Sequence, residues 1–285
     1  SEMCIRDRPG TSAWGVLVSE VMSQQTPMSR VIGPWHEWMN RWPTPDDLAE
    51  EDSGEAVAAW GRLGYPRRAL RLHSCAVAIA TEHDGVVPNS YDELVALPGI
   101  GDYTASAVVS FAFGGRATVL DTNVRRLIAR AESGIANCPT SVTRAERVVA
   151  DALVPDEDVR AAKWAVASME LGALVCTARS PQCEVCPIRD SCRWVIDGKP
   201  DNAPARRGQP WKGTDRQCRG VIMDVVRNSP RGVKVQMALS AWPEPDQASR
   251  CLESLLDDGL VHRRGSLISP VSYTHLRAHE TRGNL

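Results

Sequence analysis

The sequence predicts an all-α fold for most of its 285 residues. Between residues 11 and 192, apolar side chains recur every three or four positions in short segments, as on the buried face of a helix. Pro and Gly separate these segments, and none shows the strict alternation or the turn dipeptide that indicates a hairpin of strands. We therefore expect a set of short packed helices in this part of the chain.

The composition is that of a folded protein. An apolar fraction of 43% with nine Trp excludes a disordered or fibrous chain. No apolar run reaches the roughly 18 residues that a membrane-spanning helix needs, so we expect no membrane association. The net charge of −2 gives no general attraction to nucleic acid, and any such function must rest on local sites.

The first predicted helix follows Thr11 or Ser12, either of which can cap it, and carries Trp14, Leu17 and Val21 on one face. The same apolar spacing predicts further helices at residues 56–60, 68–80, 91–97, 103–113, 124–131, 144–153 and 161–175.

The chain after residue 196 reads as a linker and a small second unit. Residues 197–217 are rich in Pro, Gly, Arg and Lys, which predicts a linker. Residues 218–270 contain three helical patterns and two short strand patterns around Arg264-Gly265. Together these predict a small winged-helix-like α+β module, for which a packing role and a DNA-binding role stay equally open. The helices are expected at 219–227, 234–241 and 247–257, and the strands at 260–263 and 266–269.

Both ends of the chain look foreign to it. Residues 3–7 can be coded ATG TGT ATA AGA GAC, and the reverse complement of that DNA encodes residues 271–275. One DNA segment read in both senses is what a sequencing adaptor leaves behind, so residues 1–8 and 271–285 are set aside as processing scars.

Four of the nine cysteines form a cluster with the pattern Cys176-x6-Cys183-x2-Cys186-x5-Cys192. Thiolates this close in sequence can surround one metal centre. Zinc usually takes two C-x2-C pairs and only one is present here, and nothing indicates the oxidising compartment that disulfides require. Four Cys ligands suit a 4Fe–4S cluster, which we favour over zinc and disulfides.

A glycine hairpin occupies residues 97–105, Leu-Pro-Gly-Ile-Gly-Asp-Tyr-Thr-Ala, between two predicted helices. Gly99 and Gly101 allow a tight turn that exposes backbone N–H groups at the start of the next helix, which is an anion site suited to a DNA phosphate. The pattern alone is also compatible with a simple turn.

Two acidic residues stand out in this context. Glu20 follows an apolar helix face, and Asp121 stands where a helix begins. Alone, they would be a solvated helix residue and an N-cap. With the hairpin and the cysteine cluster, they form the pair that N-glycosidic chemistry requires, one acid and one anion beside the sugar.

At this point the chain resembles the helix-hairpin-helix DNA glycosylase superfamily, and within it the adenine DNA glycosylases, over residues 9–196. The similarity rests on Ser19–Thr26, Gly64-Tyr65, Leu97–Gly101, Leu120–Val124, Leu171–Ala173 and the four Cys. It implies a DNA repair enzyme that flips adenine, mispaired with 8-oxoguanine or G in duplex DNA, out of the helix and hydrolyses its N-glycosidic bond. It also implies a monomeric bacterial cytoplasmic protein.

The resemblance assigns a role to each matching residue. Glu20 protonates adenine N7, Asp121 stabilises the positively charged sugar, and Asn123 helps to orient Asp121. Relatives like endonuclease III carry a Lys nucleophile where this chain has Tyr103, which lines the pocket and cannot form an imine, so we expect a monofunctional glycosylase. Residues implied to contact DNA are Gln24, Gln25, Thr26, Leu63, Tyr65, Gly99, Gly101 and Thr104.

Three features depart from the family pattern. The family's segment before the first catalytic helix is not seen, and no Nudix-like pattern follows residue 220, so mispair recognition must rest on the catalytic domain, the short tail, or both. Val166 stands where several relatives have Gln or Glu. The alternatives are an endonuclease III-like enzyme acting on oxidised pyrimidines, a non-catalytic iron–sulfur DNA-binding protein, and an iron–sulfur redox sensor.

Overall fold

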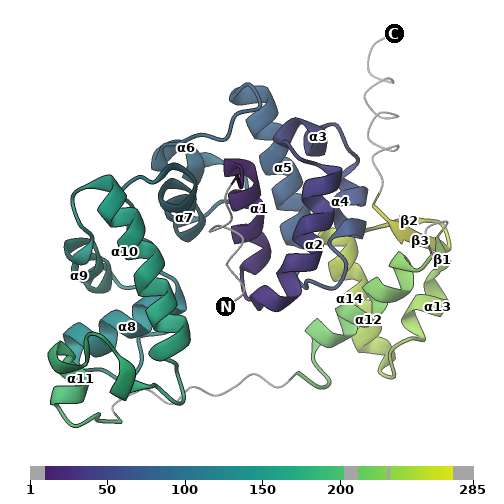
Figure 1. Cartoon of the computed structure of the whole chain (residues 1–285). Helices are drawn as coiled ribbons and strands as arrows, with labels where there is room; N and C mark the ends of the chain where they lie inside the picture. The colour runs from purple at the N-terminus through teal and green to yellow at the C-terminus, as the bar shows by residue number, and fades with distance from the viewer. Residues whose placement is uncertain (1–9, 202–210, 230–231, 272–285) are drawn as a thin grey trace.

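The computed structural model describes residues 10–201, 211–229 and 232–271. The predicted scar at 1–8, all of the predicted scar at 271–285 except Val271, and residues 202–210 of the predicted linker lie outside these ranges. Figure 1 shows three parts side by side, a first helical lobe in the centre, a second lobe on the left and a C-terminal module on the right. No helix in the described ranges is long and apolar enough to cross a membrane.

The first lobe runs from Ala13 to Phe113. Ser12 caps its first helix as predicted, because the Ser12 hydroxyl accepts a hydrogen bond from the Gly15 N–H at 3.1 Å. Helices at 28–41 and 45–49, which the sequence analysis did not predict, complete the lobe. Its helices are α1 (Ala13–Ser23), α2 (Met28–Arg41), α3 (Pro45–Ala49), α4 (Ser53–Ala59), α5 (Arg67–Glu82), α6 (Tyr91–Ala96) and α7 (Asp102–Phe113).

The second lobe is built on α8 (Thr122–Ser133), α9 (Arg144–Leu153) and α10 (Asp158–Glu170). The prediction of a helix over 161–175 is wrong for its last five residues. Helix α10 ends at Glu170, and the chain then makes a π-helical turn over Leu171–Val175. A cysteine-bearing loop follows and ends in the short helix α11 (Arg193–Ile196).

The C-terminal module places three helices beside a small antiparallel sheet of strand order β1-β3-β2. Its helices are α12 (Asp215–Arg227), α13 (Val235–Leu239) and α14 (Pro245–Asp257), and its strands are β1 (Val233–Lys234), β2 (Val261–Arg264) and β3 (Leu267–Pro270). Lys234 was expected in a helix but pairs with Leu267 in the sheet, and α12 begins within the segment expected to be a linker. The fold prediction, a mostly helical domain with a small α+β tail, is confirmed.

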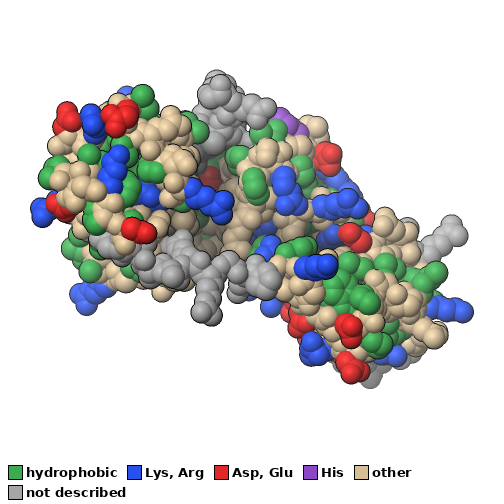
Figure 2. Space-filling model, turned by 90° about the horizontal axis from the view of Figure 1, so that it is seen from below, with side chains coloured by type: hydrophobic (Ala, Val, Ile, Leu, Met, Phe, Trp, Pro, Cys, Tyr) green, Lys and Arg blue, Asp and Glu red, His purple; other side chains and the backbone are tan. Residues whose placement is uncertain are grey.

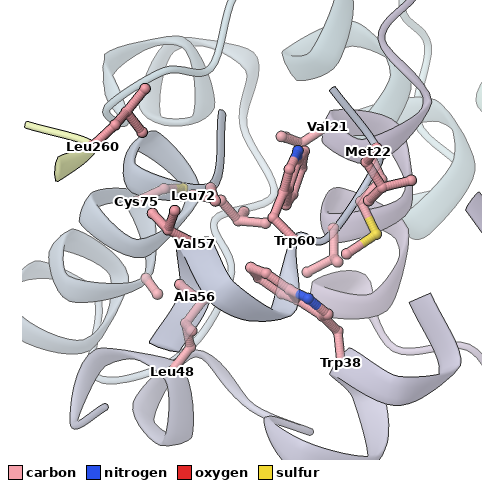
Figure 3. Packing of buried hydrophobic residues seen from close by; sticks show 14 of the residues in the cluster. Val21, Met22, Trp38, Leu48, Ala56, Val57, Trp60, Leu72, Cys75 and Leu260 are labelled. Atoms are coloured by element: carbon pink, nitrogen blue, oxygen red, sulfur yellow. The ribbon is translucent and has the colours of Figure 1, made fainter. Parts of the chain in front are cut away.

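The first lobe and the C-terminal module share one hydrophobic core. Trp38 and Trp60 are fully buried at its centre, with ring centroids 5.5 Å apart in an edge-on arrangement. Leu260 of the module joins the same core beside Val57 and Cys75, as Figure 3 shows. The second lobe has a separate core, to which Ala107 of α7 also belongs, so α7 packs against both cores.

Candidate active site

Glu20 lies in the buried middle of α1. Its side chain is only 4% exposed, and Ser19 and Val21 beside it are buried as well, because α1 packs against α2, α5 and α7. The sequence pattern alone indicated a solvated helix residue. The structure instead places this carboxyl group out of water, where it requires a hydrogen-bond partner.

Tyr103, in the first turn of α7, supplies that partner. Its hydroxyl donates to Oε2 of Glu20 at 2.8 Å. The Tyr103 ring packs against the core of the second lobe, which contains Leu120 and Val124 on either side of Asp121. One tyrosine therefore contacts both the acid of the first lobe and the core that supports the carboxylate of the second.

Asp121 caps α8, as the simplest interpretation of the sequence predicts. Oδ1 accepts the Val124 N–H at 2.7 Å, and Oδ2 accepts the Asn123 side-chain amide at 2.8 Å. Asn123 in turn accepts a hydrogen bond from Arg126 at 2.9 Å. Asp121 is half-buried, and the hydrogen bonds from Val124 and Asn123 hold its carboxylate in one orientation.

The elements that carry the two acidic residues are linked through α7 and α10. Helix α1 packs along α7, α7 contacts α10, and α10 contacts α8. Figure 2 shows that the surface is hollowed between the second lobe and the centre of the molecule. Val166 lies half-buried on α10, the helix that contacts both α7 and α8.

Arg126 is a site residue that the sequence analysis missed. Its guanidinium donates to the carbonyl oxygens of Gly172 at 2.6 Å and Cys176 at 2.7 Å, besides the bond to Asn123. Gly172 is required here because a Cβ at that position would lie 2.6 Å from the Asn123 carbonyl oxygen. This close approach explains the Leu171-Gly-Ala motif. Arg126 itself gave no local signal, because its two shortest hydrogen bonds go to carbonyl oxygens more than forty positions away.

The glycine hairpin has the predicted shape. Gly99 has a φ of +76°, and a Cβ there would lie 2.6 Å from Cβ of Arg71. Gly101 precedes α7 without a side-chain cap, which leaves the first N–H groups of this helix for an anion. Asp102 in the same turn is held by Arg147 at 2.6 Å.

Thr104 and Gln24, both predicted to contact DNA, contact each other. The Gln24 amide donates to the Thr104 hydroxyl at 3.1 Å, and Thr104 is only 1% exposed. This hydrogen bond joins the end of α1 to the start of α7, so in the absence of DNA the pair fastens the hairpin to the helix that carries Glu20.

Two short loops hold the remaining residues predicted to contact DNA, one over residues 24–26 and the other over 63–65. Gln25 and Tyr65 both have positive φ, +54° and +48°, an unusual backbone for residues other than Gly. Thr26 joins the loops through a hydrogen bond from its hydroxyl to the Leu63 carbonyl at 3.2 Å. Leu63 and Thr26 are buried, whereas Gln25 and Tyr65 are exposed.

Arg68, which the sequence analysis also missed, fixes both loops. Its guanidinium donates to the carbonyl oxygens of Val21, Gln24 and Gly64 at 2.8, 2.6 and 3.0 Å, and to the Thr26 hydroxyl at 3.1 Å. Burial lowers the pKa of Arg68 to about 10. The side chain therefore stays charged at neutral pH and holds the two strained loops together.

The four clustered cysteines line a single pocket with Arg130 and Trp194. Arg130 donates to Sγ of Cys176 at 3.3 Å, and its guanidinium lies 4.6 Å from the Trp194 ring centroid. No three His, Cys, Asp or Glu side chains among the described residues are placed to hold one shared metal ion. A four-iron cluster takes one thiolate per iron, so its ligands stand farther apart than those of a single zinc ion.

The chemistry of this donor set fits an iron–sulfur cluster. Burial, and then the proximity of Cys176, Cys192 and Cys183, raise the pKa of Cys186. Thiols that disfavour one another's ionisation need a positive centre among them to become ligands. Arg130 lines the same pocket and donates to Sγ of Cys176, which places a fixed positive charge beside the sulfur atoms.

These features define the class of protein. The chain matches the profile of the HhH-GPD superfamily of base excision DNA repair proteins over residues 18–150, and the iron–sulfur binding domain of endonuclease III over residues 176–192. The second match confirms the cofactor predicted from the cysteine spacing.

Whole-chain relatives narrow the assignment. The chain is 52% identical over 257 residues to an adenine DNA glycosylase of Mycolicibacterium smegmatis, covering 90% of this chain and 86% of the relative. It is 48% identical to the adenine DNA glycosylase of Mycobacterium tuberculosis H37Rv, and this match covers 90% of this chain and 84% of the relative. The chain belongs to the adenine DNA glycosylase family.

Solved structures agree with the fold. A thermostable thymine-DNA glycosylase, 23% identical, superimposes with a TM-score of 0.60 over 69% of this chain and 89% of that one. Endonuclease III in a non-covalent complex with DNA is 26% identical and superimposes with a TM-score of 0.57, over 66% of this chain and 86% of that one.

Proposed function

We propose that this protein excises adenine mispaired with 8-oxoguanine or G in duplex DNA, by hydrolysis and without cutting the sugar–phosphate backbone. The observation that carries the proposal is the buried Glu20 carboxyl group, hydrogen-bonded by Tyr103, in a member of the adenine DNA glycosylase family. The protein acts as a monomer in the bacterial cytoplasm, and residues 9–196 form its glycosylase domain.

The arrangement of the acidic residues supports the following reaction. The target adenosine turns out of the duplex into the hollow between the lobes. Protonated Glu20 donates its proton to adenine N7, the C1′–N9 bond breaks, and adenine leaves as a neutral base. The Asp121 carboxylate, oriented by Asn123 and the Val124 N–H, stabilises the positive charge on the sugar.

Water completes the reaction. The Glu20 carboxylate left by the first step accepts a proton from water as its oxygen bonds to C1′, which restores the acid. The Tyr103 hydroxyl bonds Oε2 of Glu20 and so holds the carboxyl group in place for both proton transfers. A tyrosine has no amine to attack C1′, and the reaction therefore ends with an abasic site.

DNA binding follows from the hairpin and the loop around the cofactor. N–H groups at the start of α7 receive a phosphate, and Gln25 and Tyr65, both exposed, meet the base opposite the adenine. Cys176, Cys183, Cys186 and Cys192 hold the 4Fe–4S cluster, which when bound supplies a rigid cross-link of the loop. Beside it, Arg179 is exposed and would meet a phosphate, whereas Arg189 and Arg193 pair with Glu184 and Asp197 and would have to exchange these partners for phosphates.

A single-turnover assay of the full chain tests the proposal. Duplexes contain A opposite 8-oxoguanine, A opposite G, or an oxidised pyrimidine opposite G, and base loss is followed with and without borohydride. We expect adenine release from the first two, fastest opposite 8-oxoguanine, with no trapped adduct. The variants Glu20→Gln and Asp121→Asn are each expected to abolish adenine release. Release of only the oxidised pyrimidine, or a trapped adduct, would contradict the proposal.

A further inference from the structure

The C-terminal module contacts the exposed loop residue Tyr65. The guanidinium of Arg216, on α12, lies 4.5 Å from the Tyr65 ring centroid and 5.0 Å from that of Trp211. Tyr65 is 39% exposed and Trp211 is 54% exposed. An arginine is thus stacked on two aromatic rings that both remain open to solvent.

The contact is made by firmly attached elements. Leu260 places the module in the core of the first lobe, and Arg67, two residues after Tyr65, pairs with Asp258 of the module at 3.2 Å. Tyr65 itself has a positive φ and is backed by Arg68, whose guanidinium is 5.7 Å from its ring. The position of Arg216 over this ring is therefore set by the fold.

Within the ranges that the structure describes, the charge of Arg216 has no acidic partner. On the same helix, Arg219 pairs with Asp258 and Arg227 with Asp224, whereas no carboxylate of the described residues pairs with Arg216. Figure 2 shows Lys and Arg side chains gathered along the seam between the first lobe and the module. Exposed aromatic rings combined with an unpaired cation are suited to a nucleic acid strand, which offers bases for stacking and phosphates for the charge.

We propose that Arg216 of the C-terminal module binds the DNA strand opposite the target adenine, holding the Tyr65 ring against the opposing base and contacting a phosphate of that strand. This inference rests on the proposed function, which assigns Tyr65 to that base. It gives the module a part in recognising the mispair, and it joins two segments that lie 151 positions apart in the sequence.

Binding measurements with four variants of the full chain test this role. Arg216→Ala removes charge and stacking, Arg216→Lys keeps only the charge, and Tyr65→Leu removes the ring. Arg250→Ala, also exposed on the module and paired only with Asp215 among the described residues, is the matched control. Affinity for duplexes with A opposite 8-oxoguanine or G is measured at several salt concentrations, with melting temperatures to monitor folding.

We expect Arg216→Ala to weaken binding to A opposite 8-oxoguanine by roughly tenfold and to lower the salt slope by about one phosphate contact. Arg216→Lys should restore the slope but not the preference for 8-oxoguanine over G, and Arg250→Ala should behave like the unaltered protein. In a protein that already carries Tyr65→Leu, adding Arg216→Ala should weaken DNA binding by a smaller factor than Arg216→Ala does in the unaltered protein.

Two results would overturn the inference. One is equal binding by Arg216→Ala and Arg250→Ala on both duplexes. The other is a loss that follows only the melting temperature and disappears when binding is expressed per folded molecule. Failure of the proposed function is distinguishable, because then the unaltered protein releases no adenine, whereas this test is read from binding.

Discussion

The Tyr103 hydroxyl donates a 2.8 Å hydrogen bond to Oε2 of Glu20, across 83 positions of sequence, and thereby joins α7 to α1. Tyr103 therefore does more than replace the lysine nucleophile of endonuclease III-like relatives, because its hydroxyl contacts the acid directly. It orients the acid, and it places the aromatic ring on the core that carries the second carboxylate.

Replacing Tyr103 by Phe removes this hydrogen bond and leaves the ring packing in place. We expect the single-turnover rate of adenine release to fall roughly tenfold with unchanged DNA affinity, since a hydrogen bond to a carboxyl group contributes about 1.5 kcal/mol. Tyr91→Phe is the control, because its hydroxyl bonds Asp102 at the surface instead. Equal rates for the two variants would show that Tyr103 does not orient the acid.

Arg68→Met leaves buried carbonyl oxygens without a donor in both loops. The free energy of unfolding, measured in urea, is expected to fall by about 3 kcal/mol, and any folded protein should discriminate poorly between mispairs. Arg67→Met, which breaks only a surface ion pair with Asp258, should cost less than about 1 kcal/mol. A loss of less than about 1 kcal/mol in the free energy of unfolding of both variants would show that Arg68 does not hold the two loops together.

Gly172→Ala tests the close contact between the π-helical turn and α8. The new Cβ would meet the Asn123 carbonyl oxygen, so we expect a loss of about 1–3 kcal/mol in stability together with slower adenine release. Gly220→Ala on α12, where nothing lies within 4 Å, is the control and should be neutral or slightly stabilising. Normal excision by Gly172→Ala would contradict the geometry.

Cys186→Ser removes one ligand of the 4Fe–4S cluster. The purified protein is expected to lose iron and its visible absorption, and to bind DNA more weakly as the loop loosens. Cys138→Ser alters a buried cysteine outside the cluster and should keep full iron content. Full iron content in Cys186→Ser as well would exclude this residue as a ligand.

Asp102 gives stability a defined pH dependence. Hydrogen bonds from Arg147, and then from Tyr91, hold the pKa of Asp102 below its ordinary 3.8. A lowered pKa in the folded state adds stability above pH 3.8, and this stability is lost as the pH falls through the folded value. Urea unfolding should therefore show a deficit in Arg147→Ala at neutral pH that shrinks in acid. A pH-independent deficit would contradict this account.

The sequence predicted what depends on local pattern. The cap of α1 at Ser12, the turn at Gly99 and the helix start at Asp121 each follow from neighbouring residues, and the structure contains all three. The cysteine spacing was equally informative, because the ligands of one centre lie within a single loop.

The remaining features depend on distant partners. Pattern alone made Glu20 a solvated residue, because burial of α1 on every side is decided by α2, α5 and α7. Arg68 and Arg126 gave no signal, since most of their acceptors are backbone carbonyls far along the chain. Strand β1 was missed because its two residues pair with a strand more than thirty positions away.

The guanidinium of Arg126 has a wider consequence. Because one side chain grips the backbone at Cys176 and the amide beside Asp121, the loop that carries the metal and the start of α8 cannot shift independently. If Asp121 acts as proposed, a molecule made in an iron-starved cell is expected to break the glycosidic bond more slowly, as well as to bind damaged DNA more weakly.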